Sequence, residues 1–192
     1  MNTANTVVYV TSNEIKFQVA LQALQNSRIA LERKSLNTPE IQSTSVKEIA
    51  EWSAIWASQQ LNQPVVVTDA GYYIEALNGF PGPFIKYVNE WFSADDYLNL
   101  LQGETNRRVI IRDCLAYCCP EEKPTVFCQS HRGEIATKAG RWNGTSIDQI
   151  LIPEGYSRPI SEIPADEMIV YWSKTTVWQE LGLYIEGLAH SG

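Results

Sequence analysis

The stretch TVVYVTSNEIKFQVALQALQ (residues 6–25) joins a strand directly to a helix. Its first part, TVVYVTS, is a β-branched run typical of a strand. In the second part, NEIKFQVALQALQ, the apolar residues Ile15, Val19 and the Leu21/Ala23 pair recur at helical spacing. This strand–turn–helix order indicates an α/β protein.

The turn in this stretch is a candidate anion site. It places Thr11, Ser12 and Asn13 at a helix N-terminus, where N–H groups and the helix dipole favour a negative charge. Lys16 lies one turn later and can point its ammonium at the same anion. The turn is not a P-loop, because the glycines and the G-K-[ST] ending are absent. The alternative interpretation is an ordinary Ser or Asn N-cap beside a surface lysine.

Strands and helices alternate at first, and a strand meander fills the second half of the chain. The patterns predict strands at 27–34, 65–69, 107–119, 125–131 and 133–139 and helices at 46–61, 89–103 and 174–188, with a loop over 140–167. Ser45 and Glu48 form a capping-box pattern at the start of the helix at 46–61. No repeat or linker divides the sequence, so one domain over residues 1–192 is expected, with two lobes around a central cleft.

The composition restricts the classes of partner. The 192 residues are 44% hydrophobic, enough for a sizeable core, and 15 Lys and Arg against 22 Asp and Glu give a net charge of −7. Duplex nucleic acid binding is not expected, because it needs a basic face. No apolar run reaches the ~18 residues of a membrane span. The first residues lack the charged and apolar regions of a secretory signal, so none is predicted. We therefore expect a soluble, cytoplasmic protein.

The cysteines and histidines give no metal motif. The spacing of Cys114, Cys118, Cys119 and Cys128 fits neither a zinc ribbon nor a C-x-x-C redox motif. Reduced structural thiols are expected, with a metal or redox role as the alternative. His131 is expected at a strand end or on the surface, and His190 in a frayed tail.

Acidic residues and a rigid loop supply further candidates. Asp69 follows the run VVVT and is predicted at the carboxyl end of a buried strand, where α/β sheets bind ligands. With Glu40 it could hold Mg²⁺ against a phosphate chain. The alternative is a turn aspartate and a solvated glutamate. The loop GFPGPFIKY, with two glycines and two prolines, allows close approach of its backbone to a ligand and has Lys86 at its exit.

Six motifs in this order resemble the inosine triphosphate pyrophosphatase family over nearly the whole chain. The T-x-N-x-x-K turn matches Thr11, Asn13 and Lys16, and the loop G-x-P-G-P-[YF]-I-K is intact from Gly79 to Lys86. The L-x-P-E-x-Q loop appears as Leu36, Pro39, Glu40 and Gln42, with one residue more before the proline. The other three matches are V-x-D-[ST]-G-L at 67–72, G-x-I at 133–135 and P-x-G-Y…E-[ML]-P at 153–164. The resemblance implies a Ham1/Maf-like fold, with a mixed twisted sheet, flanking helices and two lobes around a central cleft.

The resemblance also implies Mg²⁺-dependent hydrolysis of a nucleoside triphosphate to the monophosphate and pyrophosphate, by a homodimer. On this basis Glu40 and Asp69 organise the metal, and Asp69 is the base that activates water. The residues implied to bind substrate are Thr11, Ser12, Asn13, Lys16, Ala70, Lys86, Asp148 and Lys174.

The departures from the family pattern concern mainly the nucleobase. Thr68 replaces an acidic residue and Ala70 a Ser or Thr. The base loop F-G-[WY]-D-P reads T-S-I-D-Q and keeps only Asp148. The segment E-K-x-x-[VI]-S-H-R reads EMIVYWSK, so that Met168, Trp172, Ser173 and Lys174 occupy its lysine, serine, histidine and arginine positions.

These departures predict altered base selectivity, and they leave open a nucleotide-binding regulatory relative with little or no catalysis. A purely structural subunit has no feature in its favour.

Overall fold

The computed structural model describes residues 5–189, which form two compact units. The first unit contains the described residues up to Asp69, Cys114–Gln129 and those from Ile169 onward, and the second contains Ala70–Asp113 and Ser130–Met168. The strand order is β2-β1-β3-β5-β6-β7, with β4 paired to β3. Parallel and antiparallel pairs occur together with helices, so the predicted α/β class with a mixed sheet is confirmed.

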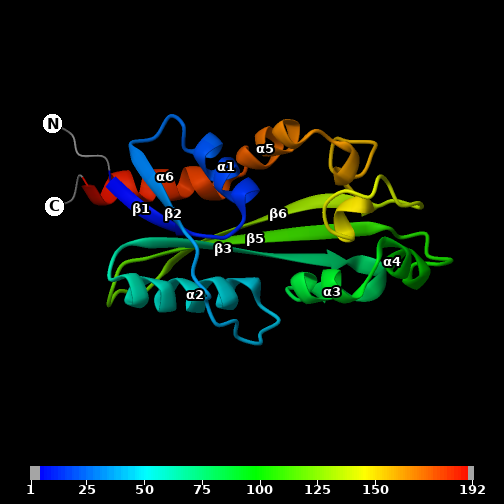
Figure 1. Ribbon diagram of the computed structural model, residues 1–192, viewed down its shortest axis with the longest axis horizontal. Helices are drawn as coiled ribbons and strands as arrows, with labels where there is room; N and C mark the ends of the chain where they lie inside the picture. The colour runs from blue at the N-terminus through cyan, green and yellow to red at the C-terminus, as the bar shows by residue number, and fades with distance from the viewer. Residues whose placement is uncertain (1–4, 190–192) are drawn as a thin grey trace. The chain divides into compact units, whose positions relative to one another are not determined.

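Parallel strands form the centre of the first unit. β1 (Asn5–Val10) pairs in parallel with β2 (Ile29–Lys34) and with the start of β3 (Val65–Ile74). Helices α1 (Glu14–Ala23) and α6 (Thr176–Ala189) lie over one face of these strands, and α2 (Val46–Leu61) lies over the opposite face (Figure 1). Because both faces are covered, consecutive β1 side chains are buried, as in other parallel sheets.

The core between β1 and helices α1 and α6 is partly aromatic. The Tyr9 ring packs edge-on against Trp178 at 5.1 Å between centroids, and Leu115, Val177 and Leu181 complete the same cluster. Such edge-to-face pairs add to the free energy gained by burying the rings. The strand–helix unit predicted from residues 6–25 is therefore fixed by residues from the other end of the chain.

Helix α2 begins and ends as predicted. The Ser45 hydroxyl accepts a hydrogen bond from the Glu48 N–H at 3.3 Å, which caps the helix. The reciprocal half of the predicted capping box is replaced, because the Glu48 carboxylate accepts from the Ser43 hydroxyl at 2.7 Å. Small residues, Ala50, Ala54 and Ala57, face the core without any exposed surface.

The second unit contains the antiparallel part of the sheet. Short β4 (Pro81–Gly82) pairs with β3, and β7 (Leu151–Pro153) pairs with β6 (Thr125–Ile135). Its remaining elements are β5 (Arg108–Cys118, continuing into the first unit), α3 (Ile85–Trp91), α4 (Ala94–Leu100), η1 (Glu75–Leu77), η2 (Ile147–Gln149) and η3 (Ile160–Glu162).

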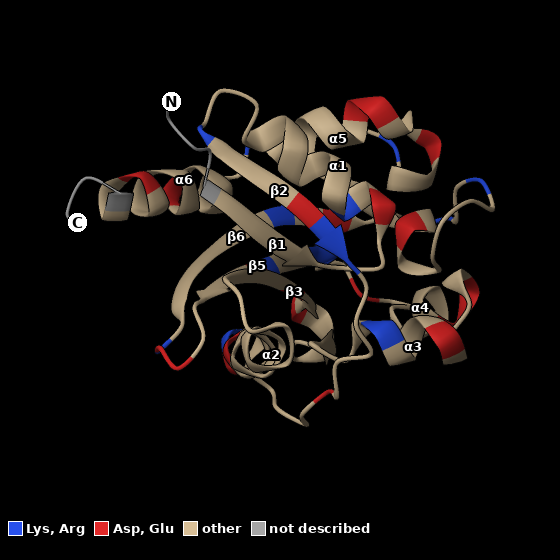
Figure 2. Ribbon diagram, turned by 60° about the vertical axis from the view of Figure 1, so that its left-hand side comes forward, with Lys and Arg blue, Asp and Glu red and all other residues tan. Residues whose placement is uncertain are grey.

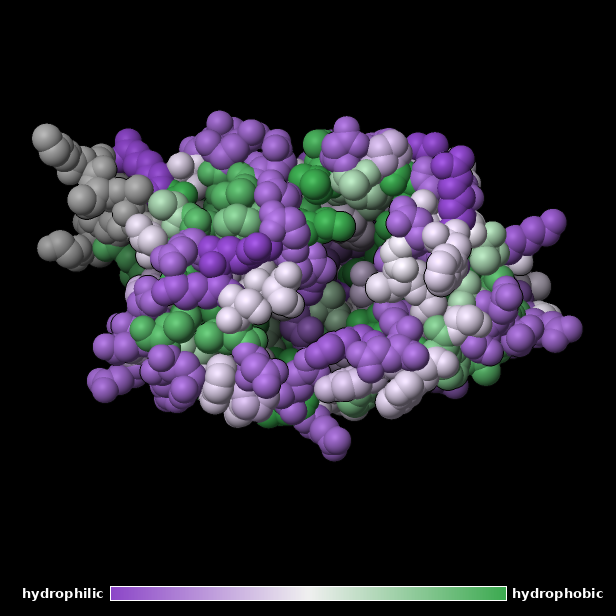
Figure 3. All heavy atoms as spheres, in the orientation of Figure 1, coloured by the Kyte–Doolittle hydropathy of each residue, from purple (hydrophilic) through white to green (hydrophobic). Residues whose placement is uncertain are grey.

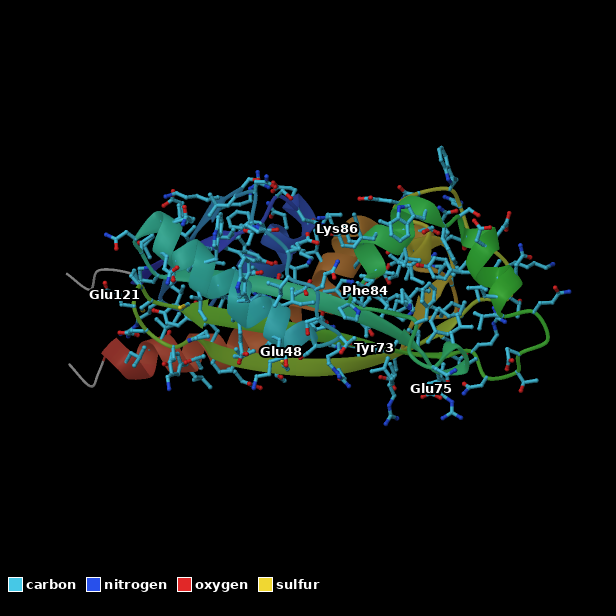
Figure 4. All side chains as sticks on the ribbon, turned by 90° about the horizontal axis from the view of Figure 1, so that it is seen from below. Glu48, Tyr73, Glu75, Phe84, Lys86 and Glu121 are labelled. Atoms are coloured by element: carbon cyan, nitrogen blue, oxygen red, sulfur yellow. A yellow bond between two sulfur atoms is a disulfide. The ribbon has the colours of Figure 1, made fainter. Side chains whose placement is uncertain are left out.

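The proline–glycine loop of this unit lies against a tyrosine. Gly82 has a φ of +58°, and a Cβ atom there would stand 3.4 Å from the Tyr73 ring. Figure 4 labels Tyr73 on β3, with Phe84 and Lys86 from the α3 segment. A side chain at Gly82 would therefore be strained by the backbone and crowded by the ring.

Several predicted elements have different boundaries. The range 89–103 is helical as predicted over much of its length, but as two helices, because α3 ends at Trp91 and Ser93 caps the separate helix α4, which ends at Leu100. The strands predicted at 125–131 and 133–139 form the single strand β6, which ends at Ile135. The loop predicted over 140–167 contains β7 and the start of α5 (Ala165–Ser173), neither of which was predicted.

The prediction of four reduced cysteines is wrong for two of them. Cys114 and Cys128 form a disulfide with Cα atoms 4.2 Å apart, whereas Cys118 and Cys119 are free. β5 and β6 bring the first pair within bridging distance, which spacing along the chain does not reveal.

The histidine predictions have different outcomes. His131 lies within β6 rather than at its end, and its Nε2 is 3.2 Å from the Asp113 carboxylate. Its side chain is only 13% exposed, so the expected surface position is wrong as well. His190 lies outside the described residues.

Hydrophilic side chains cover most of the face drawn in Figure 3, and the hydrophobic ones form separate groups. Within residues 5–189, none of the helices has the length and apolar character to span a membrane.

Candidate functional site

The carboxyl ends of β1 and β2 lie side by side, and β2 ends in two basic residues. The Thr11 N–H donates to the Lys34 carbonyl at 2.9 Å, which extends the strand pairing by one step. β2 ends in Arg33 and Lys34, and Figure 2 shows Lys and Arg in blue at the end of this strand. Arg33 is paired with Glu14, and Lys34 with Glu32 at 3.5 Å.

The turn before α1 is built from its own side chains. The Asn13 side-chain oxygen Oδ1 accepts from the Lys16 N–H at 3.0 Å, and the Asn13 N–H donates to the Thr11 hydroxyl at 3.1 Å. Asn13 is therefore the N-cap, as one of the two interpretations of the sequence expected. Other N–H groups of the first turn have no intrahelical acceptor, and Ser12 and Lys16 are exposed beside them. Anion binding at this turn stays a prediction.

Asp69 lies within β3, so its predicted place at the end of a strand is wrong. The parallel pairing of β3 with β1 ends at Val66, opposite Tyr9, and β3 continues past Asp69 to Ile74. β3 continues because residues beyond Asp69 pair with β4. Asp69 therefore lies three residues beyond the end of its parallel partner, and it is half-buried.

The residue before Asp69 is bonded to the core. Thr68 shares a 2.6 Å hydrogen bond with the hydroxyl of Tyr9, which is only 1% exposed. A neutral hydroxyl, bonded to that of Tyr9, thus stands where the family pattern has an acidic residue. This position adds no negative charge next to Asp69.

Glu40 and Asp69 are the predicted metal ligands. Glu40 is exposed in the segment between β2 and α2. Across residues 5–189 there is no cluster of three or more His, Cys, Asp or Glu side chains that could hold a metal. Mg²⁺ is commonly bound by one or two carboxylates together with substrate phosphates, so two carboxylate donors fit this ion by their chemistry.

Lys174 lies in the short connection between α5 and α6 and is exposed. The connection is held from β6, because the Gln129 side-chain oxygen accepts from the Thr176 N–H at 2.6 Å and from its hydroxyl at 3.1 Å. The Ser173 hydroxyl is buried and donates to the Val170 carbonyl at 2.9 Å. Met168 is 5% exposed. Of the four residues that depart from the family segment, Lys174 is the exposed cation.

The second unit contains Ala70, Lys86 and Asp148. Ala70 follows Asp69 directly on β3 and is half-buried. Lys86 is exposed in the first turn of α3 rather than at a loop exit, and its ammonium lies 5.5 Å from the centre of the Tyr87 ring. This is a cation–π distance.

The carboxylate of Asp148 shapes its own turn. Its Oδ2 accepts from the Thr145 N–H at 2.8 Å and from the Thr145 hydroxyl at 2.7 Å. Burial raises the pKa of Tyr72, and the Asp148 and Asp113 carboxylates raise this pKa further. Tyr72 therefore stays a neutral phenol at physiological pH.

Sequence reasoning did not identify Asn89 on α3, which contacts the same turn. The Asn89 side-chain oxygen accepts from the Ser146 hydroxyl at 2.9 Å and from the Ile147 N–H at 3.4 Å. These partners are 57 and 58 residues away along the chain, so no local signal could have revealed them.

The comparisons with known proteins agree with one another. The model of the Ham1 family matches residues 7–171. A protein named dITP/XTP pyrophosphatase from Methanopyrus kandleri is 40% identical over 161 residues, which are 84% of this chain and 86% of that protein. One of the same name from Thermococcus kodakarensis is 34% identical over the same shares of both chains.

Solved structures show the same fold. A HAM1 protein from Coxiella burnetii has a TM-score of 0.78 at 20% identity, covering 95% of this chain and 99% of the other. The Staphylococcus aureus Ham1 protein has a TM-score of 0.76 at 22% identity with the same coverage. The family match at 7–171 ends before Lys174, so it does not include that cation.

Proposed function

The chain belongs to the Ham1 family, and on that premise we propose that it hydrolyses nucleoside triphosphates to the monophosphate and pyrophosphate. The observation that carries the proposal is the Thr11–Lys16 turn, whose capped helix start and exposed lysine suit a phosphate chain. Relatives named dITP/XTP pyrophosphatase, at up to 40% identity over most of the chain, support the same reaction.

The phosphates are proposed to bind at the amino end of α1. Thr11 and Asn13 hold the turn in shape, so that the Ser12 hydroxyl and the N–H groups of the first turn are set before the substrate arrives. Lys16 and Lys174 supply positive charge. Placing such donors in advance is the main contribution of a protein to phosphoryl transfer.

Asp69 is proposed to accept the proton of the attacking water, and Glu40 and Asp69 to hold Mg²⁺. When bound, the ion neutralises charge on the phosphates. Asp69 lies on a strand rather than in a loop, which fixes the position of its backbone. Lys86 is proposed to offset charge on the substrate, while Ala70 and Asp148 are proposed to line its binding site.

The base selectivity is proposed to be weak. The family's lysine position holds buried Met168. Its histidine position holds Ser173, whose hydroxyl already donates a hydrogen bond to a backbone carbonyl. Neither supplies a donor for a 6-carbonyl group. Without such donors, pocket shape alone separates related bases only by about 10–200-fold.

The test is pyrophosphate release from ITP, XTP, GTP, ATP, UTP and dTTP with Mg²⁺, reported as kcat/KM. Release from at least one nucleotide supports the hydrolase. A preference for ITP above about a thousandfold would contradict the proposed selectivity, because discrimination of that size requires hydrogen-bonding groups aimed at the base.

Thr68 is the observation that favours the second candidate, a nucleotide-binding regulatory relative. It replaces an acidic residue beside Asp69, and its hydroxyl is committed to Tyr9. Nucleotide binding by calorimetry without any pyrophosphate release would establish this alternative.

The protein is further proposed to act as a cytoplasmic homodimer of a single 192-residue domain. Light scattering of the purified chain at several concentrations tests the dimer, and a monomer throughout the range would exclude it.

A further inference from the structure

Asn89 connects helix α3 to a distant turn. It lies three residues after Lys86 on α3, so the two side chains are neighbours on the helix surface. Its side-chain oxygen accepts from Ser146 and Ile147, and from the Tyr97 hydroxyl at 3.5 Å. Three donors from two separate segments thus converge on one oxygen atom.

The Thr145–Asp148 turn has a buried side and an exposed side. Ser146 and Ile147 are 8% and 1% exposed, whereas Thr145 is exposed. Asn89 bonds to the buried side, and Asp148 bonds back to Thr145. These two sets of hydrogen bonds fix the turn from both sides.

The residue before this turn shows how tightly it is folded. Gly144 has a φ of +76°, and a Cβ atom there would stand 2.7 Å from the Asp148 carboxylate. Position 144 therefore requires glycine, because a side chain there would be strained by the backbone and would collide with the Asp148 carboxylate. On its other side the turn is bonded to Asn89.

We propose that Asn89 is a positioning residue for nucleotide selectivity: it anchors the Thr145–Asp148 turn to α3 at a fixed position relative to Lys86. The inference rests on the proposed function, in which Lys86 and Asp148 contact the substrate. The turn has Thr145 and Ile147 where the family pattern has aromatic residues. In this chain, hydrogen bonds to Asp148 and Asn89 hold it.

The experiment compares three variants with the wild type. Asn89→Leu removes the acceptor and keeps the side chain's size, Asn89→Asp keeps an acceptor oxygen for the same donors, and Asn99→Leu changes an exposed asparagine of α4 as the matched control. Each is measured for kcat and KM with ITP, ATP and UTP, for the inhibition constant of inorganic tripolyphosphate, and for Tm.

In Asn89→Leu, we expect KM to rise about tenfold for at least one nucleotide and the ratio of kcat/KM between bases to change by at least about fivefold, since one or two hydrogen bonds are lost. Tripolyphosphate has no base, so its inhibition constant should stay within about twofold. Asn89→Asp and Asn99→Leu should keep the wild-type ratios.

Unchanged base ratios in Asn89→Leu would overturn the inference, as would an equal loss for nucleotides and tripolyphosphate. An Asn89→Asp variant that behaves like Asn89→Leu would also overturn it. Should Asn89→Leu not fold, the Asn89→Asp variant decides through its base ratios, because loss of selectivity there contradicts an acceptor role. A wild-type protein without pyrophosphate release refutes the proposed function instead, and the inference falls with it.

Discussion

The turn at Thr11–Lys16 and the turn at Thr145–Asp148 are held by contacts of different range. In the first, the hydrogen bonds join residues two and three positions apart. The second turn also has a local hydrogen bond, from the Thr145 hydroxyl to the Asp148 carboxylate, but its buried side is bonded to Asn89 on another element. The first turn is therefore encoded locally, and the second depends on how α3 packs.

This difference explains what the sequence reveals about each turn. The order of residue types at 11–16 is enough to predict the turn, because the N-cap and its hydrogen bonds lie within these few residues. At 145–148 the same kinds of residue are ambiguous, since their partner is 57 residues away. A local motif survives as a recognisable pattern, whereas a long-range anchor leaves no pattern in its own neighbourhood.

The largest expected effect is that of Asp69→Asn, which tests the proposed base. The change conserves volume but removes the charge that accepts a proton and binds metal. We expect pyrophosphate release to fall on the order of 10²–10⁴-fold, with Tm nearly unchanged. The matched control is Asp95→Asn, an exposed aspartate at the start of α4. Near wild-type activity in Asp69→Asn would remove Asp69 from the mechanism.

Lys16→Ala should have a smaller effect, limited to the binding of the substrate's phosphates. We expect triphosphate binding to weaken about tenfold and nucleoside binding to change little, because one charge-assisted contact is lost. The salt dependence of triphosphate binding should also decrease. Lys47→Ala, which removes an exposed lysine of α2, is the control for both. Equal losses for nucleoside and triphosphate would place Lys16 away from the phosphate chain.

Local signals predicted much of the fold. The helix predicted at 46–61 matches α2 at both ends, because its cap lies within four residues of its start. The division of the predicted helix at 89–103 into α3 and α4 also had a local signal, since Ser93 and Asp96 carry the spacing of a capping box. The apolar pattern continues across this helix-start signal, so the prediction joined two helices into one.

The remaining differences required tertiary structure. The length of β3 beyond Asp69 comes from pairing with β4, and the disulfide comes from the proximity of β5 and β6. The candidate site divides in the same way. Positions of Thr11, Asn13 and Lys16 in one turn followed from the sequence, whereas the hydrogen-bond partners of Thr68 and Asp148 did not.

The disulfide is the strongest long-range contact outside the candidate site. It closes a loop over a sequence separation of 14 residues. Cys128→Ser should cost about 2–4 kcal/mol, which corresponds to a fall in Tm of about 5–12 °C. Thermal unfolding of wild type and variant, with and without reductant, measures the effect. The disulfide would be contradicted if the Tm of the wild type did not change with reductant and alkylation detected four free thiols.

The smallest expected effect comes from the local cap of α4. The Ser93 hydroxyl accepts from the Asp96 N–H at 3.3 Å, and the Asp96 carboxylate accepts from the Ser93 N–H and hydroxyl at 2.8 and 2.7 Å. Ser93→Ala should cost about 1 kcal/mol, a fall in Tm of about 2–4 °C at pH 7.

The same cap predicts a pH dependence with a definite sign. The hydrogen bonds from Ser93 lower the pKa of Asp96 below its usual 3.8, because they favour the charged carboxylate. A lowered pKa in the folded state means that the stabilisation is complete above about pH 4 and is lost as the pH falls through the folded value. The Tm difference between wild type and Asp96→Asn should therefore shrink between pH 5 and about pH 3.

The Ser93→Ala variant provides the control, because it lacks the hydroxyl that donates to the Asp96 carboxylate. The Tm difference between Ser93→Ala and the Ser93→Ala/Asp96→Asn double variant should therefore depend less on pH. A difference that grows toward low pH would reverse the sign and show that Asp96 is stabilised in its protonated form.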